Sequence, residues 1–348
     1  MMRVKMLYDF IRSDNSDSSR IQWIDNARGI CMFLVIVVHS GYMPDIYRFF
    51  LEPFFLTTFF FISGYLFKNP DKVISTKIKL LSIVESVLIP YLVYWVISFT
   101  IAGLLKGDLS LTELLKDIAM GNKLWFIAAL FLSQIMFCIQ LNINRNVTSI
   151  LLFSFGSILV WYFTPLSDSM TKFPWSINSA FVANFFIGLG YIARIYKQQF
   201  LKIINNFRVG IFVGIAFLFF VILNYMLLNF PYNFPANNFG NIGMFIVHSL
   251  FGVYSTLFIS NLIRDNYLLM FIGANSLLFY FFQNQALNLL KKVAMIVDVT
   301  SPSYVAPLIM ALVTVLLLTI PTILVNKYFP IMAGKAKPVT RRLMEKHR

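Results

Sequence analysis

The chain has 348 residues, of which 58% are hydrophobic and only 13% are charged. An average soluble chain carries about 25% charged residues, so this composition excludes an ordinary soluble domain. The net charge of +14 raises the question of nucleic-acid binding. The sequence contains no nucleic-acid-binding motif, and its basic residues follow a membrane topology, so we expect no nucleic-acid partner.

Long apolar stretches follow one another from residue 27 to residue 328 and predict an all-α, polytopic integral membrane bundle. We divide the chain into an N-terminal segment (1–26), a transmembrane domain (27–328) and a basic tail (329–348). About ten membrane-spanning helices are expected, at residues 27–44, 48–67, 80–105, 123–141, 147–164, 179–196, 207–229, 241–262, 267–290 and 304–327.

The distribution of lysine and arginine predicts how these helices are oriented. If the N-terminus is cytoplasmic, 22 of the 29 basic residues fall on the inner side. This excess is what the positive-inside rule predicts for an even number of spans with both termini cytoplasmic. We therefore expect a multi-pass protein of the cell (inner) membrane, whose basic tail lies against anionic headgroups of the bilayer.

The first expected helix contains an arginine and a histidine that lie eleven positions apart, Arg28 and His39. At about 100° and 1.5 Å per residue they share one face and lie roughly 16 Å apart along the axis. A titratable imidazole in the middle of a membrane helix is costly, so it indicates function, although a structural histidine that packs helices is the alternative. A neutral histidine is suited to act as a general base on a hydroxyl group. An arginine at the cytosolic end suits phosphate groups, or it sets topology alone.

Other charged residues near the cytoplasmic side are candidates for the same site. Asp25 lies one turn before Arg28 and either holds its side chain or stabilises the helix N-terminus. Glu85 lies inside the third expected helix, where it pairs with Arg28, serves as a relay or remains a hydrated interfacial carboxylate. Lys77 and Lys79 precede it and either contact phosphate or only mark the inner side.

Polar residues also occur in the later helices. His248 lies among small residues of the eighth expected helix and can link helices there. Asn275 and Gln283 lie in the ninth, and such amides need partners in the membrane, so they link helices or line a polar cavity. Cys31 and Cys138 fall within helices and do not indicate a disulfide framework. No Cys/His cluster has zinc spacing, so we expect no metal.

Several of these segments resemble one known family. The chain is similar to the integral-membrane acyltransferase family 3, and within it to the branch of fucose 4-O-acetylase-like sugar O-acetyltransferases. The likeness covers most of the chain. It rests on Ile24–Ile30 with Val37–Ser40, which match the family's Arg/His signature, and on Phe59–Leu66, Leu88–Tyr91, Lys123–Phe126 with Leu130–Phe131, and Gly273–Leu277 with Tyr280. Gln283 stands where the family has a histidine, and Lys77 and Lys79 stand where many members have arginines.

The resemblance implies transfer of an acyl group, most often acetyl, from cytosolic acyl-CoA to a sugar hydroxyl of a surface polysaccharide or of its lipid-linked precursor. Arg28, Lys77 and Lys79 would then bind the CoA phosphates. His39 would deprotonate the acceptor hydroxyl or itself take the acyl group. Ser40, Trp125, Asn275 and Gln283 would orient the sugar.

Two other classes of function stay open from the sequence. One is a transporter or flippase of a lipid-linked glycan with His39 as a proton relay. The absence of an evident inverted repeat or pair of Gly/Pro-broken helices weakens this hypothesis. The other is a non-catalytic scaffold of a glycan-assembly complex. The oligomeric state is not predicted.

Overall fold

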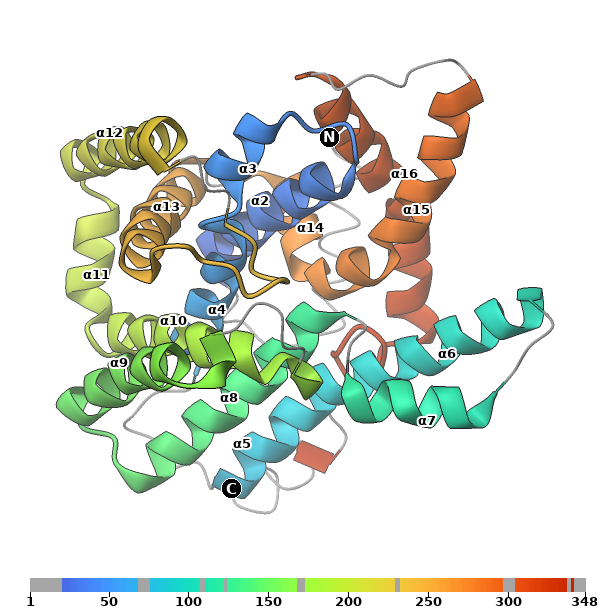
Figure 1. The fold of residues 1–348 in the computed structure, drawn as a ribbon, viewed down its shortest axis with the longest axis horizontal. Helices are drawn as coiled ribbons and strands as arrows, with labels where there is room; N and C mark the ends of the chain where they lie inside the picture. Colours follow the sequence, from blue (N-terminus) through green and yellow to red (C-terminus); the bar gives the residue numbers. More distant parts are fainter. Residues whose placement is uncertain are drawn as a thin grey trace. The chain divides into compact units, whose positions relative to one another are not determined.

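The computed structural model describes residues 21–67, 76–106, 110–121, 124–167, 173–228, 232–263, 265–296, 304–336 and 339–340. These residues form helices joined by short turns, and none of them belongs to a β-strand. The predicted all-α class is therefore confirmed. Figure 1 shows the order of the helices along the chain.

Each of the ten expected segments contains a helix or consecutive helices. In chain order these are α2 (Gln22–His39), α3 (Asp45–Leu51) and α4 (Phe55–Tyr65), α5 (Thr76–Ile83), the π-helix η1 (Val84–Leu88) and α6 (Ile89–Lys106), α8 (Trp125–Ile143), α9 (Val147–Phe163), α10 (Ile177–Ile195), α12 (Phe207–Leu223) with the π-helix η4 (Asn224–Leu228), α13 (Ile242–Ile263), α14 (Tyr267–Ala274) and α15 (Ser276–Ile296), and α16 (Ala306–Tyr328).

By length and composition, seven helical segments among the described residues are able to cross a membrane, which agrees with a polytopic membrane bundle. They are Ile46–Tyr65, Thr76–Leu104, Trp125–Ile143, Pro174–Ile195, Phe207–Met226, Ile242–Ile263 and Ala306–Tyr328. The helix α9 is a shorter apolar helix. The expected number of ten spans and the cytoplasmic location of both termini stay predictions.

Two helices occupy segments that we expected to be loops. The helix α7 (Leu111–Met120) begins at Ser110, whose Oγ accepts a hydrogen bond from the backbone N of Glu113, and ends at left-handed Gly121. The helix α11 (Lys197–Ile204) lies between α10 and α12. Both are too short to span a bilayer. A search for long apolar runs does not find such helices.

The first helix is shifted relative to the prediction, which placed it at residues 27–44. It begins at Gln22 and ends at His39. Gly41 follows in the left-handed region, with a φ of 86°, and Pro44 precedes α3. Glycine and proline at these positions are typical of a helix end. His39 is therefore the last residue of α2. The prediction that it lies in the middle of a helix is wrong.

Two of the expected helices are interrupted. The second is divided into α3 and α4 at residues 52–54, around Pro53, and the ninth is divided into α14 and α15 at Asn275. A pair of Gly/Pro-broken helices is one of the two features whose absence weakens the transporter hypothesis. Only the first interruption contains a proline, and neither bears on the other feature, an inverted repeat, so both classes of function stay open at this point.

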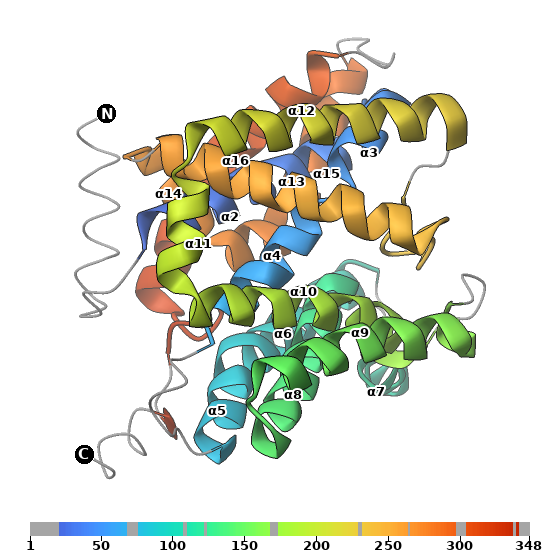
Figure 2. The same ribbon diagram turned by 90° about the vertical axis from the view of Figure 1, so that its left-hand side faces the viewer.

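The chain forms two compact units. The first comprises the described parts of Met1–Phe59, Lys197–Tyr232 and Phe239–Asn326. In it, α2 packs against α13, α14 and α15, and α12 lies beside α13 (Figure 2). A Cβ atom on Gly29 would lie against the carbonyl oxygen of Leu269, and one on Gly273 against that of Asp25. The helices α2 and α14 therefore cross with their backbones in direct contact.

The second unit comprises the described parts of Phe60–Tyr196, Asn233–Asn238 and Lys327–Arg348. In it, α10 packs against α8 and α9. Glycines again permit a close approach, because a Cβ on Gly64 would meet the carbonyl oxygen of Ile187 and one on Gly190 that of Phe61. Small residues at helix crossings are typical of membrane bundles, where close packing contributes much of the helix association.

The crossing of α2 and α14 predicts the effect of adding one methyl group. Gly273→Ala should lower the free energy of unfolding by about 1–3 kcal/mol, because the methyl group meets backbone that cannot move aside. The measurement is the thermal unfolding midpoint of the purified protein in detergent. Gly156→Ala in α9 is the matched control, since a Cβ there meets nothing within 4 Å. Equal midpoints for the two variants would contradict this packing argument.

Candidate active site

The helix α2 carries Asp25, Arg28 and His39 without interruption. Because it is a continuous α-helix, Arg28 and His39 lie on one face, about three turns apart. Arg28 is half-buried, whereas the His39 side chain is exposed on the surface of the protein. The shared face, which the sequence predicted from spacing alone, is therefore present in the structure.

The imidazole of His39 is oriented by its own helix. Its Nδ1 lies 2.8 Å from the backbone carbonyl oxygen of Val35, one turn earlier. A carbonyl oxygen only accepts hydrogen bonds, so Nδ1 must carry the proton in this contact. In the neutral ring Nε2 is then unprotonated, and its lone pair can accept a proton. The geometry thus provides an oriented base at the end of α2.

A lysine that we did not predict lies next to this histidine. The Nζ atom of Lys291, in α15, donates a hydrogen bond of 3.0 Å to the backbone carbonyl oxygen of His39. A Cβ on Gly41 would lie 3.1 Å from the end of the same lysine side chain. The last carbonyl groups of a helix lack hydrogen-bond partners within the helix, and Lys291 is the donor to one of these carbonyl groups. In the sequence, Lys291 is only a basic residue just beyond the expected helix 267–290, which gave no reason to select it.

The acidic and amide residues at the start of α2 are buried. Asp25 is 6% exposed, and Asn26 is fully buried and donates from Nδ2 to the backbone carbonyl of Ser260 in α13, at 3.2 Å. This bond fixes where α2 lies along α13. The predicted role of Asp25 in holding Arg28 stays a prediction.

Three residues predicted to orient the acceptor also belong to the first unit. Ser40 is fully buried, and its Oγ accepts a bond from the backbone N of Tyr42 at 3.4 Å. Asn275 donates to Phe271 O and accepts from Asn326 Nδ2, both at 2.8 Å, so it links the α14–α15 break to α16. Gln283 is 1% exposed, and its Oε1 has no hydrogen-bond partner among the described residues.

The remaining predicted site residues belong to the second unit. Lys77 is exposed, and the Lys79 ammonium lies 3.9 Å from the centroid of the Phe67 ring. Trp125 begins α8 and stacks on Phe234, with ring centroids 5.6 Å apart. The predicted site residues thus belong to both units, with one group on α2 and its neighbours in the first and another in the second.

Glu85 has an environment that the sequence did not suggest. It lies in the π-helix η1, is 5% exposed and accepts hydrogen bonds from the backbone N atoms of Val339 and Thr340, at 2.9 and 3.2 Å. The hydroxyl of Thr340 also donates to it. The carboxylate therefore binds residues 339 and 340 near the C-terminal end. The three alternatives for Glu85, an ion pair with Arg28, a relay or a hydrated interfacial carboxylate, stay predictions. Its catalytic role stays a prediction.

His248 is fully buried in α13 and packs against aromatic rings. Its ring centroid lies 5.1 Å from that of Phe217 and 5.8 Å from that of Tyr232. Neither ring nitrogen has a hydrogen-bond partner among the described residues. His248 thus links α12 and α13 by packing.

The structure thus presents a polytopic helical bundle with an oriented histidine and an arginine on one face of α2. Among known protein families, the acyltransferase domain of acyltransferase family 3 matches residues 21–326 of the chain. The chain therefore belongs to this family of membrane acyltransferases. No curated protein and no solved structure matches it.

The contact between Lys291 and His39 predicts a positioning role for the lysine. Lys291→Ala should lower kcat for acyl transfer about tenfold, equivalent to about 1.4 kcal/mol, because the end of α2 loses its hydrogen-bond donor. The KM for the acyl donor should change little. Lys292→Ala is the matched control, since Lys292 is the exposed neighbour on the same helix. Equal activity of the two variants would show that the contact has no role.

The Glu85 cluster predicts that the C-terminal segment stabilises the second unit. Thr340→Val should lower the free energy of unfolding by about 1.5–3 kcal/mol, because a charged acceptor loses a donor. Thr100→Val is the control, since the Thr100 hydroxyl is exposed and donates to Val96 O of its own helix. Thermal unfolding of both variants, each also combined with Glu85→Gln, gives the coupling energy. Additive effects of Thr340→Val and Glu85→Gln would contradict a direct interaction.

Proposed function

We propose that the protein moves an acetyl (acyl) group from cytosolic acyl-CoA to a hydroxyl of a surface polysaccharide or of a lipid-linked sugar. The observation that carries the proposal is the orientation of His39, whose Nδ1 is bound to Val35 O while Nε2 remains available. The shared face with Arg28 and membership in the acyltransferase family support it.

In direct transfer, Nε2 of His39 takes the proton of the acceptor hydroxyl while the hydroxyl oxygen attacks the thioester carbon. The new C–O ester bond forms, the C–S bond breaks, and the proton passes from Nε2 to the departing CoA sulfur. In the covalent route, Nε2 itself attacks the thioester carbon, the C–S bond breaks and CoA leaves as its thiolate. The oxygen of the acceptor hydroxyl then attacks the acyl carbon, the C–N bond breaks to return the imidazole, and the hydroxyl proton passes to the CoA thiolate. Both routes use the same nitrogen, so both require the orientation that Val35 imposes.

Arg28 is proposed to bind the phosphates of the donor. CoA carries its phosphates at one end and its thiol at the end of a long arm, so phosphate and thioester contacts must lie far apart. Arg28 and His39 are separated by roughly 16 Å along α2, since they lie eleven residues apart. A guanidinium binds phosphate with paired, charge-assisted hydrogen bonds.

The other assignments rest on the sequence and on the family resemblance. Lys77 and Lys79 are proposed to contribute to donor binding. Ser40, Trp125, Asn275 and Gln283 are proposed to orient the sugar. Asp25 and Glu85 are proposed to support Arg28 and proton transfer. We further propose that the protein lies in the cell (inner) membrane with both termini cytoplasmic, because the basic residues concentrate on the side of the N-terminus.

The decisive experiment compares the surface glycan of cells that carry wild-type protein, His39→Ala or Lys292→Ala. His39→Ala should lower the rate of acylation by about 10²–10⁴-fold, since it removes the base, and the acyl mass should disappear from the glycan. The His39 side chain is exposed, so the variant should accumulate in the membrane like the wild type. Acylation retained in His39→Ala would overturn the proposal.

A further inference from the structure

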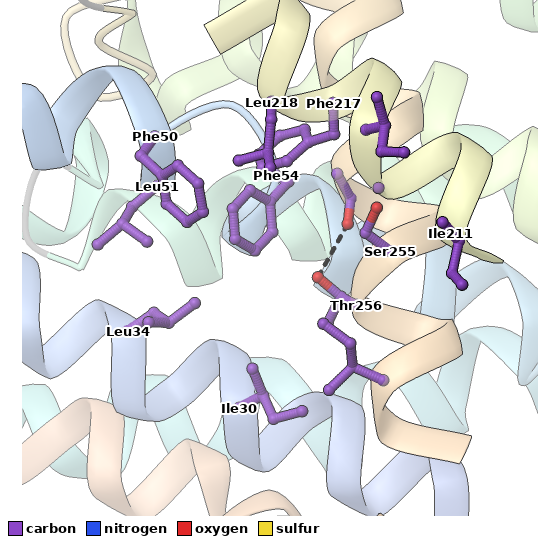
Figure 3. A pocket seen from close by; sticks show the side chains of 14 residues that line it. Ile30, Leu34, Phe50, Leu51, Phe54, Ile211, Phe217, Leu218, Ser255 and Thr256 are labelled. Atoms are coloured by element: carbon purple, nitrogen blue, oxygen red, sulfur yellow. Dashed lines mark hydrogen bonds between the residues drawn. The ribbon is translucent and has the colours of Figure 1, made fainter. Parts of the chain in front are cut away.

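The first unit contains an apolar cavity of about 450 Å³ (Figure 3). It is lined by residues from α2, α3, α12 and α13, among them Ile30, Leu34, Phe50, Ile215 and Leu218. None of its lining residues carries a charge. The cavity therefore offers no ion pair to a phosphate or carboxylate.

Only two lining side chains have polar atoms. The Thr256 hydroxyl donates to the backbone carbonyl of Gly252 at 2.9 Å, the bond drawn in Figure 3. The Ser255 Oγ has no hydrogen-bond partner among the described residues. The surroundings of the cavity are otherwise hydrocarbon, so they favour an apolar occupant.

The membrane-spanning segments determine what surrounds the cavity. Two of its walls belong to the spans Phe207–Met226 and Ile242–Ile263. Lining residues on these walls are largely exposed on the protein, with Ile215 at 62%, Leu218 at 49% and Ile259 at 46%. In a bilayer such apolar faces of spanning helices meet lipid chains. The medium beside the cavity is therefore hydrocarbon.

The cavity lies behind the helix that carries the proposed catalytic pair. Ile30 and Leu34 follow Arg28 by two and six residues, so at about 100° per residue they point to the side of α2 opposite Arg28 and His39. The cavity is therefore separate from the face of α2 that we assign to acyl transfer. An empty apolar cavity at this place would leave α2 without packing on one side.

We propose that one acyl chain of a bilayer phospholipid occupies this cavity and packs against α2. The acyl chain makes the packing contacts with α2 that the side chains of α12 and α13 do not make there. Its binding depends on cavity shape and not on acyl transfer. The proposal therefore stands whether or not His39 is catalytic.

The glycine Gly214 allows a direct test. It lines the cavity, and a Cβ added there meets nothing within 4 Å. Gly214→Phe should therefore fill the cavity without distorting the backbone. Gly156→Phe is the matched control, because Gly156 is likewise a helical glycine with open space, but it lies in α9 of the second unit. Gly214→Leu is a smaller second variant in case the phenylalanine variant fails to fold.

The experiment measures dioleoyl phosphatidylcholine bound to the delipidated, full-length protein by native mass spectrometry, and the thermal midpoint with and without this lipid. Wild type and Gly156→Phe should retain the lipid and be stabilised by it. Gly214→Phe should retain about tenfold less and gain little stability from added lipid. Ser255→Ala should behave like the wild type, because the cavity binds the acyl chain of the lipid and makes no hydrogen bond to it.

Three results would overturn the proposal. The first is equal lipid retention by wild type and both Gly214 variants. The second is loss of retention in Ser255→Ala, which would indicate a ligand held by its polar group. The third is displacement of the phospholipid by an equal amount of a polyprenyl phosphate, which would indicate an isoprenoid occupant. None of these results bears on acyl transfer, which the His39→Ala experiment tests separately.

Discussion

The close crossing of α2 and α14 is the contact on which the first unit depends. Gly29 and Gly273 each lie against a backbone carbonyl of the other helix, so neither position has room for a side chain. Apolar helices gain no hydrophobic free energy by leaving lipid for one another, so backbone proximity of this kind contributes much of their association. Because α2 carries both Arg28 and His39, the crossing and the bond from Asn26 to Ser260 together position the proposed catalytic pair.

The interruption at Asn275 allows one expected helix to support both ends of α2. The α14 part places Gly273 beside Asp25, near the start of α2, and the α15 part places Lys291 at the carbonyl of His39, at its end. A break inside a membrane leaves backbone groups without partners, and polar side chains must satisfy them. Asn275 does so through Phe271 O and is itself held by Asn326. The Asn275 amide therefore has a structural role, whatever it contributes to acceptor binding.

Two features of the sequence made part of this structure predictable. They are the length of the apolar segments and the free-energy cost of placing polar groups in lipid. Each of the ten segments that runs of hydrophobic residues located contains a helix, and polarity in the first helix singled out Arg28 and His39. Contacts to backbone were not predictable. Lys291 binds a carbonyl group that every residue possesses, and Glu85 binds backbone N atoms 254 and 255 residues away. The short helices α7 and α11 were missed because neither has the length that marks a span.

The position of His39 in the structure gives a different reason for its expected reactivity than the sequence gave. From the sequence, it was a candidate because an imidazole in the middle of a membrane helix is costly. In the structure it ends α2, exposed and followed by a turn, so that cost no longer singles it out. Its orientation does so instead, because Val35 fixes the proton on Nδ1 and leaves Nε2 free to react. The helix end also brings it to Lys291, since the carbonyl that Lys291 binds lacks a partner only because the helix stops there. The end of α2 at Ser40 and Gly41 thus has two effects. It positions the imidazole of His39, and it leaves the His39 carbonyl oxygen free to accept the hydrogen bond from Lys291.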